Sequence, residues 1–426
     1  MDLFKRFKKD YFNYLISIIL PALISGLSIP VFKHLLGAKG YGNFSIWINA
    51  ILILTAVFSG WITQSIIRFF AASSDKYSFS RKAIKLSTET QLLFFLPVFF
   101  ACWYFSKDFI LAILCSFVLI STSIQFTILP IIQSSFLSKK IISSETIRIF
   151  TYVSLAILLL KLTLVPYMYC LFIAAFISYT LSLMYLVKQG HKFLKQQQNV
   201  SASKQQTTRL FKSFFKYGAP LSLWFIFSYL FSYIDKFFMY KYMGAEAQGN
   251  YQAIFDLLYK SISLLISPVI TSMFPILTAA YEKEDKSQIR KFIRKIMYYE
   301  LSGFLISGIL YWAFGAKILL YILKIPDTFS FRLSGFIIIC GTFVLQLAIL
   351  AQKRFELKFN TLYLLLMSAI TFVIQVIFYL VLKHLNNPLI YPLGFLLATV
   401  VYLFLISFTE LLSFSKSIKL RLKYRP

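Results

Sequence analysis

The sequence predicts an all-α membrane protein of about twelve transmembrane helices in two six-helix lobes, related by a pseudo-two-fold axis along the membrane normal. Three observations support this fold class. Hydrophobic residues make up 58% of the chain and the mean hydropathy is +0.72. Long apolar runs follow one another with short polar connections. A glycine-containing motif also occurs twice, once in each half of the chain.

The apolar runs set the number of crossings. A bilayer core about 30 Å thick takes roughly 20 helical residues, so 426 residues have room for about a dozen crossings. We expect helices because lipid offers no partners to unpaired backbone groups, and because barrel strands would alternate in polarity. The predicted spans are 11–36, 43–70, 83–105, 108–138, 141–163, 164–188, 213–241, 250–279, 291–315, 329–352, 356–383 and 388–413.

The basic excess of the chain has two ordinary explanations, nucleic-acid binding or loops at an anionic membrane face. The chain has 44 Lys and Arg against 16 Asp and Glu, a net charge of +28. The Lys and Arg residues gather in short stretches between apolar runs, as the positive-inside rule describes. The predicted outer ends of the spans carry about a third as many Lys and Arg as the predicted inner ends. We therefore expect a multi-pass protein of the bacterial inner (plasma) membrane with both termini in the cytoplasm, and no nucleic-acid partner.

One extended polar stretch divides the chain near its middle. Residues 188–212 are rich in Gln, Ser and Lys, a composition typical of a flexible linker. The sequence therefore predicts an N-terminal lobe over 1–188, a cytoplasmic linker over 189–212, a C-terminal lobe over 213–415 and a basic cytoplasmic tail over 416–426.

The repeated motif lies between the first two helices of each half. Gly37-Ala38 with Gly42-Asn43 recurs as Gly244-Ala245 with Gly249-Asn250, at an offset of 207 residues. The glycines suit a tight outer turn, and each Asn could cap the helix that follows. Two similarly oriented sextets favour a transporter that works by alternating access. Prolines and Gly218 interrupt several spans and could be bends or static packing features.

Polar residues at membrane depth are the candidate substrate-binding residues. Lys260 lies roughly 15 Å into its span, and Asp256 precedes it by one helical turn. They could form a self-neutralising packed pair, or line a polar lumen for an anionic or sugar-rich substrate. The 207-residue offset places Asn49 at the position of Asp256. Further residues that could face the same lumen are Asp235, Gln64 and Arg68, although Arg68 could equally mark the inner interface.

Other ionisable residues lie nearer the predicted span ends. For Lys33, Glu89, Arg148 and Lys236 we expect snorkelling to the interface. The four cysteines lie in apolar runs without metal-ligand spacing, and the three histidines are near loops or helix ends. No catalytic motif is present, so the sequence predicts no enzyme activity, no cofactor and no metal site.

Several short motifs together resemble a known family. They are the basic N-terminus, the Leu36–Gly42 segment, Lys216–Leu221, and the stretch from Ile234 through Gly244 to Tyr251. In order and spacing they resemble the Wzx-type polysaccharide flippases of the MATE-like multidrug/oligosaccharidyl-lipid/polysaccharide exporter superfamily, and the likeness covers the whole chain.

The resemblance implies movement of undecaprenyl-pyrophosphate-linked oligosaccharide from the inner to the outer leaflet for O-antigen or capsule assembly. It implies that Lys260 and Arg68 meet the pyrophosphate, and that a polymerase and a chain-length regulator are partners besides the bilayer. Two alternatives remain open. One is a drug or lipid II exporter of the same fold. The other is a membrane polysaccharide polymerase or glycosyltransferase, which the short outer loops disfavour.

Overall fold

The computed structural model describes the backbone of residues 3–70, 73, 75–135, 138–162, 165–195, 204–282, 286–357 and 361–423. Within those ranges the side chains of residues 3–23, 68, 138–139, 191–195, 204–213, 215–217, 221, 264–265, 267–282, 286–292, 354, 356–357, 361 and 409–423 are not described. Every secondary-structure element in the described ranges is a helix, which confirms the predicted all-α class.

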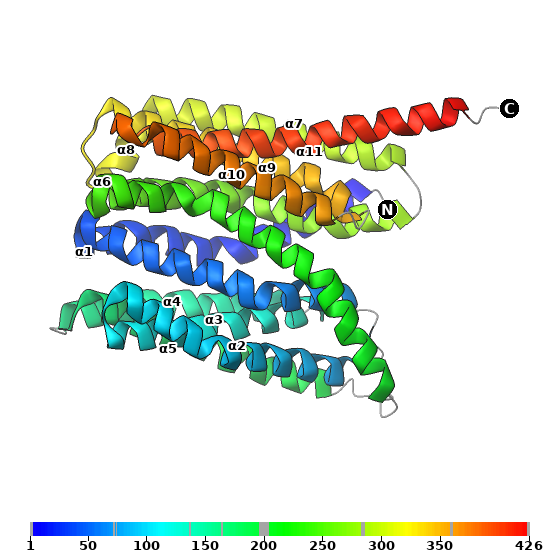
Figure 1. The fold of residues 1–426 in the computed structure, drawn as a ribbon, viewed down its shortest axis with the longest axis horizontal. Coiled ribbons are helices and arrows are strands. Elements are labelled where there is room, and N and C mark those ends of the chain that lie inside the picture. Colours follow the sequence, from blue (N-terminus) through cyan, green and yellow to red (C-terminus); the bar gives the residue numbers. More distant parts are fainter. Residues whose placement is uncertain are drawn as a thin grey trace. The chain divides into compact units, whose positions relative to one another are not determined.

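The helices are shown in Figure 1. The long ones are α1 (Leu3–Phe69), α2 (Lys76–Ser106), α3 (Phe109–Ser134), α4 (Ser138–Leu162), α5 (Tyr167–Lys195), α6 (Lys204–Glu282), α7 (Lys286–Leu310), α9 (Phe329–Leu357), α10 (Thr361–Leu382) and α11 (Ile390–Lys423). A π-helical turn, η1 (Tyr311–Gly315), joins α7 to the short α8 (Ala316–Ile322), and a 3₁₀ turn, η2 (Lys383–Leu385), follows α10.

Helices α1 and α6 each contain two predicted spans, joined at one glycine. Gly37 (φ 68°, ψ 170°) interrupts α1, and Gly244 (φ 86°, ψ 172°) interrupts α6. These angles belong to a region open almost exclusively to glycine, so the predicted need for glycine in the repeated turn is confirmed at both positions. We call the helical parts before and after each glycine the first and second limbs of α1 and α6. The second limb begins directly after the glycine, so Asn43 and Asn250 lie inside helix and the predicted caps are wrong.

The described residues contain eight helices long and apolar enough to cross a membrane. One of these candidates, Ile24–Ile67, spans the break at Gly37 and covers parts of two predicted spans. The protein is thus a multi-pass membrane protein, and the exact number of about twelve crossings stays a prediction.

Packing divides the chain into two compact units. The first unit is Ser17–Tyr229, and the second unit combines Met1–Ile16 with Leu230–Pro426. The division falls inside α1, between Ile16 and Ser17, and inside α6, between Tyr229 and Leu230. Helix α5 continues to Lys195 and α6 begins at Lys204, so helices extend from both sides into the predicted linker, of which 196–203 lie outside the described residues. The predicted lobe boundaries stay predictions.

In the first unit, α3 packs against α2 and α5, and α4 packs against α5. A core cluster of Ile62, Ile66, Phe70, Phe79 and Phe214 joins the second limb of α1 to α2 and to the start of α6. Gly218 is helical and faces the backbone of Trp61 so closely that a Cβ atom would have no room. This glycine therefore permits close helix packing, the static one of its two predicted roles.

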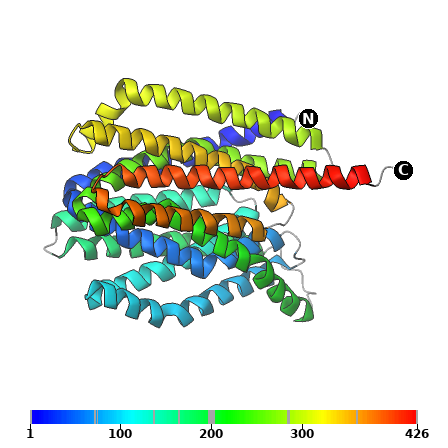
Figure 2. The same ribbon diagram turned by 45° about the horizontal axis from the view of Figure 1, so that its top comes forward.

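In the second unit, α9 packs against α7 and α11, and α11 packs against α10. Figure 2 shows α7, α9 and α11, coloured from yellow-green to red, running alongside one another. Tyr379 of α10 donates a hydrogen bond to the backbone oxygen of Tyr391, 3.0 Å away, and so ties α10 to the start of α11. Gly394 permits this contact, because a Cβ atom at that position would clash with the Tyr379 ring.

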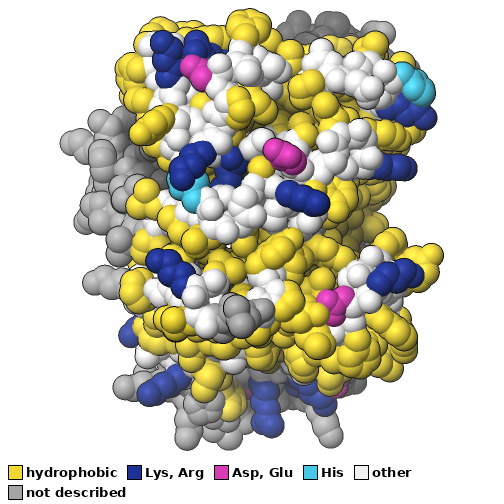
Figure 3. All heavy atoms as spheres, turned by 90° about the vertical axis from the view of Figure 1, so that its left-hand side faces the viewer, with side chains coloured by type: hydrophobic (Ala, Val, Ile, Leu, Met, Phe, Trp, Pro, Cys, Tyr) yellow, Lys and Arg dark blue, Asp and Glu magenta, His cyan; other side chains and the backbone are white. Residues whose placement is uncertain are grey.

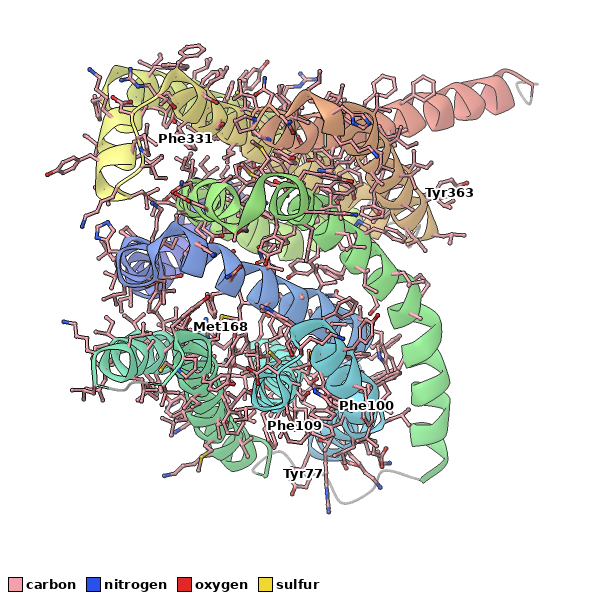
Figure 4. All side chains as sticks on the ribbon, turned by 60° about the vertical axis from the view of Figure 1, so that its left-hand side comes forward. Tyr77, Phe100, Phe109, Met168, Phe331 and Tyr363 are labelled. Carbon is pink, nitrogen blue, oxygen red and sulfur yellow. The ribbon has the colours of Figure 1, made fainter. Side chains whose placement is uncertain are left out.

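Many large hydrophobic side chains of α2, α7 and α10 are exposed, as a lipid-facing surface requires. Figure 3 looks onto the helix ends at the left of Figure 1, where Lys and Arg side chains lie among hydrophobic ones. Exposed aromatic side chains include Phe100, Phe109 and Tyr363, and Tyr363 projects outward from α10 in Figure 4.

The glycine turns give a direct test of the fold. Gly37→Ala places a Cβ in a backbone conformation that costs about 1 to 3 kcal/mol for other residues, although the space around the Cβ is empty. We expect a lower thermal unfolding midpoint in detergent for this variant. The matched control is Gly26→Ala on the same helix, where the backbone is helical and the space is equally open. Equal midpoints for the two variants would show that the turn is not strained.

Candidate functional site

A fully buried ion pair lies on the first limb of α6, in the second unit. The Lys236 Nζ is 3.1 Å from Asp235 Oδ1, and both side chains have no exposed surface. The same Nζ donates to the Ser232 backbone oxygen at 2.7 Å and to Asp235 Oδ2 at 3.2 Å. A charge this deep in the protein must be compensated locally, and here both the carboxylate and a backbone dipole contribute.

Aromatic rings enclose the Lys236 ammonium. It lies 3.0 Å from the centroid of Phe255 and 4.9 Å from that of Tyr233. The rings of Tyr251 and Phe395 lie at 5.7 and 5.8 Å. Ring faces carry negative potential, so they stabilise a cation that water cannot reach. Four rings from α6 and α11 therefore hold this lysine in place.

The second limb of α6 supplies the remaining polar groups of this cluster. The Tyr251 hydroxyl donates a short hydrogen bond to Asp235 Oδ2 across the Gly244 turn. Asp256, one turn further along, is half-buried, and its charge also acts on Lys236. Two of the predicted substrate-binding residues, Asp235 and Asp256, therefore lie in one cluster, and both act on Lys236.

A second charged cluster lies in the first unit, between α3, α4 and α5. Arg148 Nη2 is 2.6 Å from Glu145 Oε2, and its Nε is 3.0 Å from the same oxygen. Gln125 donates to Glu145 Oε1 at 2.9 Å and to the Ser182 hydroxyl at 3.0 Å. The guanidinium stacks 5.0 Å from the ring centroid of Tyr179.

Arg148 lies near the middle of α4, which has 25 residues. It is ten residues from the first, about 15 Å along the axis. Its side chain is 23% exposed, and its Nη1 makes no hydrogen bond with the described residues. A partly exposed cation at this depth is costly if it faces lipid, which makes Arg148 a candidate for a polar interior surface.

The other predicted residues are placed as follows. Lys260 is exposed on the second limb of α6, and Gln64 is half-buried on the second limb of α1. Asn49 is 4% exposed. Arg68 lies on α1, but its side chain is outside the described residues. The structure groups Asp235 with Asp256 inside the second unit. Asn49, Gln64 and Arg68 belong to the first unit.

The expectation of snorkelling is wrong for three of four residues. Lys236 and Lys33 are buried, with 0% and 5% exposure, and Arg148 is held by Glu145 near the middle of its helix. Glu89 is the exception: it is exposed and lies 3.7 Å from Lys85. Distance to a span end does not reveal which face of a helix a residue occupies. In the sequence, the acid next to Lys236, Asp235, is the one signal that could have indicated a buried ion pair.

Most of the chain matches a family of known proteins. Residues 7–280 match the family model described as polysaccharide biosynthesis protein. The chain belongs to the polysaccharide biosynthesis protein family. No curated protein sequence is a significant match. Family membership confirms the resemblance inferred from the sequence motifs.

Several solved transporter structures are similar to this family member. A mutant of the MATE transporter VcmN from Vibrio cholerae matches with a TM-score of 0.73 at 13% identity, covering 98% of this chain and 97% of that one. A MOP superfamily transporter from Pyrococcus furiosus matches with a TM-score of 0.69 at 14% identity, covering 96% of both chains. At such identities the likeness shows the fold: this chain has a MATE-like transporter fold.

The buried pair yields a stability prediction. Lys236→Met leaves Asp235 buried without its countercharge, which costs about 3 to 5 kcal/mol. We expect a strongly lowered thermal unfolding midpoint in detergent. The double variant Asp235→Asn with Lys236→Met removes both charges and should recover most of the loss. A single variant as stable as the wild type would refute the importance of the pair.

Proposed function

We propose that this protein is a flippase for undecaprenyl-pyrophosphate-linked oligosaccharide, moving repeat units from the cytoplasmic to the outer leaflet for O-antigen or capsular polysaccharide assembly. The observation that carries the proposal is the family match over residues 7–280, combined with a fold of the MATE exporter type. A polysaccharide pathway needs a membrane exporter because its lipid-linked intermediates are too polar to cross a bilayer unaided.

Alternating access is the proposed mechanism. A multidrug resistance MATE family transporter of the MOP superfamily is known in an outward-facing and in an inward-facing conformation, and both match this chain, with TM-scores of 0.68 and 0.69. The shared fold supports the same cycle here, with the sugar-bearing headgroup passing through the protein and the lipid tail remaining in the bilayer.

Cationic groups would compensate the pyrophosphate during this passage. Lys260 and Arg68 are the proposed contacts, with the half-buried Asp256 and Gln64 as polar lining. Asp235 and Asn49 are buried in this conformation, so they would line the passage in another conformation of the cycle. The exposure of Lys260 leaves its ammonium able to meet a ligand. Arg148 is a further proposed contact for the pyrophosphate, because it lies deep in its span. Its guanidinium is partly exposed and has hydrogen-bond donors that the Glu145 contact does not use.

Location and partners follow from the same proposal. The protein would lie in the bacterial inner membrane with both termini in the cytoplasm, where the excess of Lys and Arg at one set of span ends would hold it. A polymerase and a chain-length regulator would act on the translocated units. The proposal assigns the protein transport and no catalytic step.

The test is replacement of Lys260. We expect Lys260→Ala to abolish surface polysaccharide, measured by immunoblot and gel profile, while the amount of protein in the membrane stays at the wild-type level. Lys85→Ala is the matched control, because Lys85 is also exposed, at 74%. Normal polymer in the Lys260 variant would remove that residue from the mechanism. Normal polymer in a strain lacking the whole protein, with raised drug sensitivity, would instead favour a drug exporter.

A further inference from the structure

Glu300 is a buried acid that the clusters above leave out. It lies on α7, inside the candidate span Ile293–Ile322, and only 5% of its surface is exposed. Neither carboxyl oxygen has a hydrogen-bond partner among the described residues. In this respect Glu300 differs from other acids of its unit, such as Asp235 beside Lys236 and Asp327 beside Arg332.

The surroundings of Glu300 follow from the packing of α7 on α9. Phe304 meets Phe343 with ring centroids 5.3 Å apart, and Trp312 meets Phe336 at 5.6 Å. These pairs define an antiparallel register, which brings Glu300 close to the level of Gln346. The Gln346 amide nitrogen itself donates to the Ser263 hydroxyl at 3.3 Å.

Charged groups on these two helices lie away from that level. Arg294 and Lys295 on α7 are exposed, more than one turn towards its start. On α9, the cations with described side chains are Arg332 and Lys353, near its two ends. Among the described residues, no cation forms an ion pair with the Glu300 carboxyl, and neither of its oxygens accepts a hydrogen bond. On α6, Lys260 lies one turn from Ser263, and its side chain is exposed.

An ionised carboxylate in this position would have neither countercharge nor hydrogen-bond donor. Removing such an ion from water costs several kcal/mol even after the protein relaxes, and a buried acid avoids this cost by keeping its proton. A neutral carboxyl also fits an apolar contact surface such as that between Phe304 and Phe343. The geometry therefore requires a neutral Glu300 in this conformation.

We propose that Glu300 is a proton-binding site within the membrane, loaded in this conformation and unloaded when water reaches the α7–α9 contact. On unloading, the carboxyl O–H bond breaks, the electron pair stays on the carboxylate, and the proton passes to water. Because the proton binds one conformation better than the other, its binding and the conformational change are linked reciprocally. The proposal concerns the protein alone, and it stands or falls independently of the transported substrate.

Infrared spectroscopy of the purified full-length protein in lipid tests the loaded state. At neutral pH we expect a carbonyl band of a protonated carboxyl that is absent in Glu300→Gln. The control is Glu89→Gln, since Glu89 is an exposed acid at 58% and its replacement should leave the band unchanged. No such band in the wild type, or an unchanged band in Glu300→Gln, would overturn the proposal.

A second variant and a titration complete the test. Glu300→Asp keeps the carboxyl on a shorter side chain, so it should shift the band, and it serves if the Gln variant does not accumulate. Raising the pH should convert the wild-type band reversibly into carboxylate absorption as hydrated conformations are populated. A band that persists until the protein unfolds would show that the carboxyl does not exchange its proton, and would overturn the site as proposed.

Discussion

The cost of leaving a polar group without a partner in an apolar medium determines most of this structure. For the backbone, it requires helices throughout the membrane-embedded segments. Among the side chains, Asp235 is paired with Lys236 and Glu145 with Arg148. Hydrogen-bond donors and aromatic rings further stabilise both pairs. Glu300 has no hydrogen-bond partner among the described residues, so the same cost favours its neutral, protonated form.

The fold was accessible to sequence reasoning because its two strongest signals are physical constraints. Apolar runs of spanning length have one stable solution in lipid, and the paired motifs at Gly37 and Gly244 mark backbone angles that other residues avoid. The cap prediction for Asn43 is wrong because the sequence around it suits a helix interior equally well.

The site was less predictable for a related reason. Depth along a helix can be counted from the sequence, whereas the face a residue occupies depends on neighbours from distant segments. Lys236 has the sequence context of a snorkelling residue, and only the folded chain places Phe395 of α11 and Phe255 around it. The predicted span that holds Arg148 starts at 141, whereas the helix begins at Ser138. Glu300 follows a basic stretch on α7 and does not stand out from the chain alone.

The single-residue turns also limit how the protein can move. The two limbs of α6 share no loop that could absorb a relative rotation, so any change in the angle between them falls on the two backbone dihedrals of Gly244. The hydrogen bond from Tyr251 to Asp235 bridges the same corner. The two limbs are therefore coupled at the turn. A displacement of the first limb, which holds Lys236, also displaces the second limb, which holds Asp256.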